Sequence, residues 1–114
     1  MPHCIIEYSK QIEQTLAVQE LVSLVHHSVF LSELFEESSI KTRAIEFEHY
    51  QTGLSNMPFI HITLKIMFGR NHQQKKKLAA LVLDKLNEVF TAPISLSVEV
   101  MDIDKVGYKR IVIE

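Results

Sequence analysis

The proline directly after the initiator methionine is the first residue in the chain that could do chemistry. Removal of Met1 would leave Pro2 with a free secondary amine, and an α-amino group has an ordinary pKa of about 8. Burial and nearby cations would disfavour its ammonium form, and a base that is neutral near pH 7 suits proton transfer at carbon. The alternative interpretation is that Pro2 only begins an edge strand. If Met1 is retained, the Pro2 nitrogen belongs to an amide and cannot act as a base.

Arg70 is a candidate for anion binding. It follows Gly69 at the end of a predicted strand, just before Asn71, a predicted helix cap. The first turn of a helix offers unpaired N–H groups and a positive dipole, so an arginine beside it suits a carboxylate ligand. The alternative is an ordinary solvent-exposed arginine.

Lys41 and Arg43 form a second cationic candidate. They stand two residues apart on a predicted strand, so both side chains project from one face and could bind one anion together. The alternative is that they pair with the acidic residues near them in the sequence, Glu36, Glu37 or Glu46.

Composition limits what these residues could serve. The chain has 114 residues and a formal net charge of −2, which excludes binding to nucleic acid or membranes by bulk charge. The only cysteine, Cys4, cannot form an internal disulfide and favours a reducing compartment, and the N-terminus lacks the features of a signal peptide. We therefore expect a cytoplasmic protein with no nucleic-acid or membrane partner.

Motifs for cofactors and metals are missing from the sequence. It contains no glycine-rich phosphate loop and no nucleotide fingerprint. His3, Cys4, His49 and His61 could be combined into a zinc site on paper, but no spacing supports one. We expect neither a cofactor nor a bound metal.

Alternating and helical patterns predict the elements that position these residues. One helix is expected over Ile12–Phe30, and a second from the Asn71 cap to about Thr91. Five strands are predicted, over Pro2–Ser9, Ile40–Gln51, Pro58–Phe68, Ile94–Ile103 and Tyr108–Glu114.

This order predicts an α+β fold in a single domain over residues 1–114. Two β-α-β repeats, one over about 2–51 and one over about 58–103, would form a four-stranded sheet with both helices on one face, and a tail strand would follow over 108–114. The other face mixes polar and apolar side chains. That face could contact water or sister subunits, and the pattern alone favours neither.

These features together resemble the tautomerase superfamily. More specifically, the segments MPHCIIEYS, IKTRA and HITLKIMFGR resemble the 5-carboxymethyl-2-hydroxymuconate isomerase family of homoprotocatechuate degradation, a route of aromatic compound catabolism. The resemblance extends from Pro2 to about Lys109. It implies a homotrimer whose sheets form a central barrel wrapped by the helices, so that the mixed face lies inside.

The resemblance also implies roles for single residues. Pro2 matches the family's catalytic amino-terminal proline, and Arg70 matches an arginine that binds substrate carboxylates. The family strand compared with Ile40–Ala44 carries two arginines, which correspond here to Lys41 and Arg43. Lysine offers a point charge where arginine offers a bidentate fork, so the substrate assignment is affected most.

The implied activity is a cofactor-independent isomerisation of a small-molecule carboxylate. A dienol such as 5-carboxymethyl-2-hydroxymuconate would lose a proton from its enol hydroxyl and regain it at carbon, with Pro2 as the base. Two alternatives stay open. One is a tautomerase that acts on a smaller 2-keto acid enol, and the other is a non-catalytic trimer of the same fold.

Overall fold

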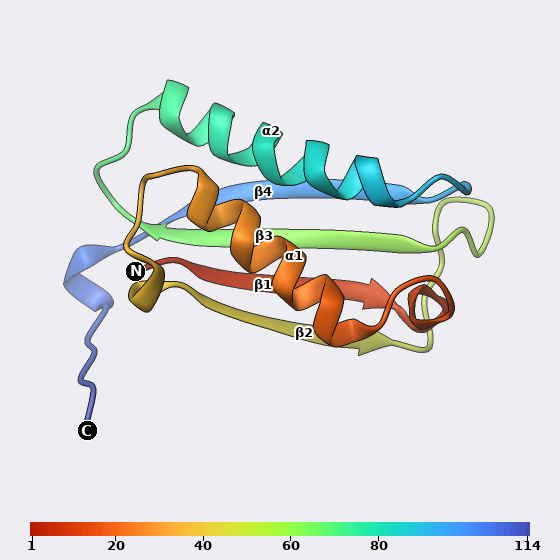
Figure 1. Cartoon of the computed structure of the whole chain (residues 1–114), viewed down its shortest axis with the longest axis horizontal. Coiled ribbons are helices and arrows are strands. Elements are labelled where there is room, and N and C mark those ends of the chain that lie inside the picture. The colour runs from red at the N-terminus through yellow and green to blue at the C-terminus, as the bar shows by residue number, and fades with distance from the viewer.

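The fold is a four-stranded mixed sheet covered on one face by two helices (Figure 1). It is described here from a computed structural model of residues 1–114. The strands are β1 (His3–Ser9), β2 (Lys41–Phe47), β3 (Phe59–Met67) and β4 (Ser95–Ile103), in the spatial order β2-β1-β3-β4. The helices are α1 (Val18–Leu31) and α2 (His72–Val89). The predicted α+β architecture of two β-α-β units is confirmed.

Strand directions bring distant parts of the sequence to one end of the sheet. β1 pairs with β2 and β3 with β4 in parallel, while β1 and β3 pair antiparallel at the centre. The beginnings of β1 and β2 therefore lie at the same end as the ends of β3 and β4. Both chain termini also lie at this end (Figure 1).

The core lies between the sheet and the helices. Alternate strand residues such as Ile6, Ile62 and Leu64 are fully buried against helix residues such as Val25 and Val82. Burying one aliphatic side chain of this size stabilises a fold by about 1.5–3 kcal/mol. The predicted core-facing alternation is confirmed, including for Cys4, whose thiol pKa is raised to about 11 by its burial.

The opposite face of the sheet is uncovered in the protomer. It presents charged residues such as Lys65 and Glu99 beside apolar ones, and the exposed fractions of Ile45 and Met101 are 47% and 45%. Neither helix has the combination of length and apolar character that crossing a bilayer requires.

Two predicted boundaries are wrong. The first helix begins at Val18 rather than Ile12, because Lys10–Gln14 forms a short 3-10 helix that buries Ile12, and Ala17 is extended. β2 ends at Phe47 rather than Gln51, because the chain turns into a loop closed by a bridge between Thr52 and Ser55.

The predicted tail strand over 108–114 is also absent. After β4 a 3-10 turn, Lys105–Gly107, leads the chain away from the sheet, and residues 108–114 make no backbone hydrogen bond. Because the turn carries the segment away from the open edges of β2 and β4, its alternating residues pair with no strand in the protomer.

The N-terminus of α2 is fixed by a capping box, as its sequence predicts. The Asn71 side chain accepts a hydrogen bond from the Gln74 backbone N–H at 2.8 Å, and the Gln74 side chain accepts one from the Asn71 N–H at 2.9 Å. These bonds satisfy two of the donors that a helix end leaves without partners.

We expect Asn71→Ala to lower the free energy of unfolding by about 1 kcal/mol, because that backbone donor loses its acceptor. Urea denaturation at one fixed protein concentration measures the change. The neighbouring exposed residue supplies the control, since Gln73→Ala should stay within about 0.5 kcal/mol of the parent. Equal stability of the two variants would show that the cap contributes nothing.

Candidate active site

Pro2 is buried at the end of the sheet where the termini meet. Its carbonyl accepts a hydrogen bond from the Lys41 backbone N–H at 3.0 Å, which joins the start of β1 to the start of β2. Met1 precedes Pro2 in the structure, so the free amine belongs to Met1. Burial lowers the pKa of this amine, and the positive charges of Arg110, Arg70 and Lys41 lower it further. An amine at this end of the sheet is therefore shifted toward its neutral form.

Arg70 reaches this end from the turn between β3 and α2. Gly69 allows the turn, because its φ of 128° lies in the region that favours glycine. The Arg70 Nη2 donates a hydrogen bond to the Leu34 carbonyl at 2.7 Å, and the guanidinium lies over the Phe35 ring, 5.3 Å from its centroid. Its Nε is buried and has no hydrogen-bond partner. Arg70 is therefore a half-buried, oriented cation rather than an ordinary exposed arginine.

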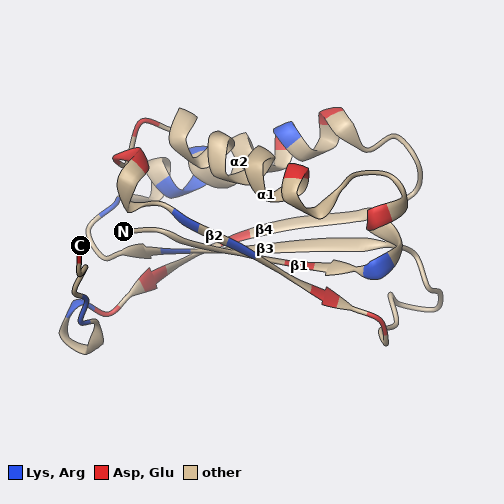
Figure 2. Ribbon diagram, turned by 60° about the horizontal axis from the view of Figure 1, so that its bottom comes forward, with Lys and Arg blue, Asp and Glu red and all other residues tan.

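Lys41 and Arg43 stand in register with His3 and Ile5 of β1, so both project from one face, as predicted, and this is the uncovered face of the sheet. Figure 2 marks the basic positions of β2 in blue. None of the three ion pairs in the structure involves either residue, so the alternative pairing with nearby glutamates is wrong. Arg43 instead places its Nη1 3.1 Å from the Nδ1 of His3. Both positive charges stay free of carboxylate partners within the protomer.

His3 connects two side chains that are far apart in the sequence. Its Nε2 lies 2.9 Å from the Tyr108 hydroxyl, and its Nδ1 faces Arg43. Burial lowers the pKa of His3, and the charges of Arg43, Lys41, the N-terminus and Lys65 lower it further. A neutral imidazole can accept a hydrogen bond from the guanidinium of Arg43 through one nitrogen and donate to the Tyr108 hydroxyl through the other.

This histidine borders a hollow of about 390 Å³ on the uncovered face. The hollow is lined by two cations, an acidic residue and several apolar or aromatic side chains: His3, Arg43, Lys65, Met101, Asp102, Ile103 and Tyr108. A second hollow, of about 290 Å³, lies next to the N-terminus and shares Tyr108 with the first.

The four residues singled out from the sequence divide into two places. Pro2, Lys41 and Arg70 lie together at the amine, whereas Arg43 lies two residues further along β2, at the His3 hollow. Sequence reasoning missed Tyr108 and Arg110. The alternating pattern of residues 108–114 predicts only a strand. The same pattern also places Tyr108 and Arg110 on one side of an extended segment, and this signal could have identified them.

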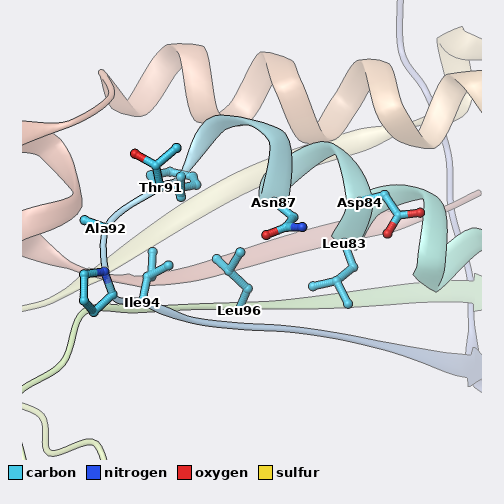
Figure 3. Close-up of a pocket in the computed structure, with 9 residues that line it drawn as sticks. Leu83, Asp84, Asn87, Thr91, Ala92, Ile94 and Leu96 are labelled. Carbon is cyan, nitrogen blue, oxygen red and sulfur yellow. The ribbon is translucent and has the colours of Figure 1, made fainter.

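A third hollow lies away from the N-terminus and has no cation in its lining. It has a volume of about 610 Å³ and lies between the C-terminal half of α2 and the beginning of β4 (Figure 3). Its one charged lining residue is Asp84, and Asn87 and Thr91 supply its other polar side chains. Without a cation, it is poorly suited to a carboxylate ligand.

A four-stranded mixed sheet built from two β-α-β repeats, with both helices on one face, is a tautomerase-like fold. The model of the 5-carboxymethyl-2-hydroxymuconate isomerase family matches residues 2–113, so the chain belongs to this family and is an isomerase.

Solved structures agree on the fold. A 5-carboxymethyl-2-hydroxymuconate isomerase from Deinococcus radiodurans R1 is 24% identical, with a TM-score of 0.80, over 96% of this chain and 87% of that chain. A 5-carboxymethyl-2-hydroxymuconate delta-isomerase is 12% identical, with a TM-score of 0.77, over 98% and 88%. A fused 4-OT symmetric trimer is 12% identical, with a TM-score of 0.70, over 91% and 87%. No curated protein matches the chain.

Proposed function

We propose that the chain is a cofactor-independent isomerase that moves a proton from an enol hydroxyl to carbon in a dienol carboxylate, with the amine of Pro2 as the base. The observation that carries the proposal is the buried amino end of β1, where burial and the charges of Arg110, Arg70 and Lys41 all disfavour an ammonium ion. Removal of Met1 transfers the free amine to Pro2, one residue further into this environment.

The reaction needs one base that acts twice. The neutral Pro2 nitrogen takes the proton of the substrate's 2-hydroxyl, the O–H bond breaks, and the oxygen becomes a carbonyl as the double bonds shift. The resulting ammonium then returns the proton to a carbon further along the conjugated chain. Because no atom is gained or lost, no co-reactant is needed.

The cations have two roles in this scheme. They hold the substrate carboxylates by charge-assisted hydrogen bonds, and they stabilise negative charge as it moves onto the substrate oxygen. Arg70 suits the first role because its guanidinium is already oriented by Leu34 and Phe35. Lys41 and Arg43 suit it because neither is neutralised by a carboxylate in the protomer.

The substrate that we propose is 5-carboxymethyl-2-hydroxymuconate, on the basis of the family. Lys41 favours a second candidate, the enol of a smaller 2-keto acid. A lysine ammonium gives a point charge in place of a bidentate fork, so it holds an additional carboxylate less rigidly.

We also propose that the chain assembles as a homotrimer. The uncovered face exposes Ile45 and Met101, and the outer edges of β2 and β4 are unpaired in the protomer. Exposed strand edges and apolar patches favour contacts with further copies. The fused 4-OT structure, which shares the fold, is a symmetric trimer.

Blocking the amine tests the base. Intact mass should show that Met1 is absent from the active protein, and a form with a Gly-Ser extension before Pro2 should isomerise the dienol about 10²–10⁴-fold more slowly, because an amide nitrogen cannot take the proton. Pro2→Ala, also processed, is the control for the change at this position: its primary amine is still a base, so activity should fall but persist. Equal rates for the extended and processed forms would show that the amine is not the base.

Two substitutions test the cations. Arg70→Ala should reduce kcat/KM for 5-carboxymethyl-2-hydroxymuconate by roughly 10- to 100-fold, because a charge-assisted hydrogen bond contributes about 1.5–3 kcal/mol. Lys76→Ala removes an exposed positive charge from α2 and is the matched control. Lys41→Arg should raise activity on this substrate relative to a smaller 2-keto acid enol. If Arg70→Ala behaves like Lys76→Ala, Arg70 does not bind substrate.

Light scattering at micromolar protein concentration tests the trimer. We expect three times the protomer mass for the parent, and a smaller assembly for Ile45→Glu, which adds a charge to the uncovered face. Leu54→Glu makes the same kind of change in an exposed loop and should leave the trimer intact. A parent that is monomeric under these conditions would exclude the proposed assembly.

A further inference from the structure

The C-terminal segment, residues 108–114, is held to the domain by side chains. It makes no backbone hydrogen bond, and the 3-10 turn before it leads away from the sheet. Two side-chain hydrogen bonds connect it to the rest of the protein, Tyr108 with His3 and Arg110 with Met1. The position of the segment relative to the sheet therefore depends on these side chains.

The first contact joins the segment to β1. The Tyr108 hydroxyl lies 2.9 Å from the Nε2 of His3, and the two rings meet edge-on with centroids 5.8 Å apart. Because His3 also contacts Arg43 through its other nitrogen, Tyr108 is linked through one imidazole to both β1 and β2. These contacts hold Tyr108, the first residue of the segment, in place beside the start of β1.

The second contact brings a cation to that end. The Nη1 of Arg110 lies 3.0 Å from the sulfur of Met1, and both residues line the hollow of about 290 Å³ at the N-terminus. Arg110 has no carboxylate partner in the structure. When Met1 is removed, its side chain no longer fills the space beside this guanidinium, which then faces the start of β1.

From this geometry we infer that Arg110 is a further substrate-binding residue of the proposed site, and that the Tyr108–His3 contact positions it there. The inference rests on the proposed function, because it assigns Arg110 to the carboxylate of the substrate that Pro2 isomerises. His3 and Tyr108 are positioning residues, since they act through Arg110 and through the path of the segment.

The charges around the amine give this inference a second measurable consequence. Lys41 acts on the amine from β2, Arg70 from the turn after β3 and Arg110 from the C-terminal segment. A nearby cation disfavours the ammonium form, so loss of Arg110 raises the pKa of the amine. Activity that depends on the neutral amine then begins at a higher pH. A substitution that only loosened the fold would not move this pH dependence in a fixed direction.

The test compares three variants of the processed protein. Arg110→Gln removes the charge, Tyr108→Phe keeps the ring but removes the hydroxyl, and Lys109→Gln removes a charge from the exposed neighbouring residue as the control. For each, kcat and KM for 5-carboxymethyl-2-hydroxymuconate are measured across pH. The pKa of the amine is measured separately, without substrate, by nuclear magnetic resonance of protein labelled with ¹⁵N-proline.

We expect Arg110→Gln to raise KM by roughly tenfold, because a charge-assisted hydrogen bond to the substrate is lost. The same substitution should raise the pKa of the amine, because one of the cations that disfavour the ammonium form is removed. Tyr108→Phe should change both quantities in the same direction by less, and Lys109→Gln should change neither. If Arg110→Gln matches Lys109→Gln in both measurements, Arg110 is not part of the site. If Arg110→Gln changes both but Tyr108→Phe changes neither, the positioning role of Tyr108 is wrong.

Failure of the proposed function gives a different result. If the parent does not isomerise the dienol, the assignment of Pro2 as its catalytic base fails, and the substrate-binding role of Arg110 fails with it. The titration of the amine still shows whether Arg110 lies beside the amine. An active parent in which neither KM nor the pKa of the amine responds to Arg110→Gln would contradict the inference alone.

Discussion

The antiparallel pairing of β1 with β3 is the interaction on which the rest of the structure depends. It places Ile6 opposite Ile62 at the centre of the sheet and joins two parallel β-α-β units that would each leave a strand edge open. The pairing also fixes direction: β1 begins where β3 ends. Pro2 and Arg70, at the two ends of these strands, must therefore lie at the same end of the sheet. Backbone geometry thus decides which side chains can share a site, and the side chains decide what that site binds.

The start of β1, around the N-terminal amine, combines burial with an excess of positive charge. This combination does not stabilise the fold. Three cations, Arg110, Arg70 and Lys41, act on one amine, and none of them forms an ion pair with a carboxylate. Repulsion of this kind weakens the folded state unless an anion enters. The same repulsion lowers the pKa of the amine, so the arrangement that is unfavourable for the empty protein favours both a neutral base and a bound carboxylate. Lys75, by contrast, is paired with Asp102 at 3.1 Å.

Most of the fold could be predicted because it depends on local patterns. Alternation over β3 and β4, the capping box at Asn71 and the helical stripe of α2 each follow from residues close in sequence. Lys41 and Arg43 were placed on one face by the same argument. The first helix was extended too far because Ile12 fits a helical stripe equally well from a 3-10 turn. The tail strand failed because alternation predicts a strand but not the neighbour with which it must pair, and the path of residues 108–114 is set by Tyr108 and His3, 105 residues apart.

That separation also explains why the site is assembled from four segments rather than from one motif. An amine is shifted toward its neutral form by burial and by cations, but cations placed next to it in the sequence would share its strand and project alternately to both faces of the sheet. Charges from β2, from the turn after β3 and from the C-terminal segment can instead approach it from different directions. Each of them is held by a contact of its own: Lys41 by its backbone bond to Pro2, Arg70 by Leu34 and Phe35, and Arg110 by the segment that Tyr108 fixes. Any one of these cations could therefore be exchanged for another, such as arginine for Lys41, without moving the amine. In the site that we propose, the strand pairing keeps the amine in place, while the surrounding segments determine which carboxylate it meets.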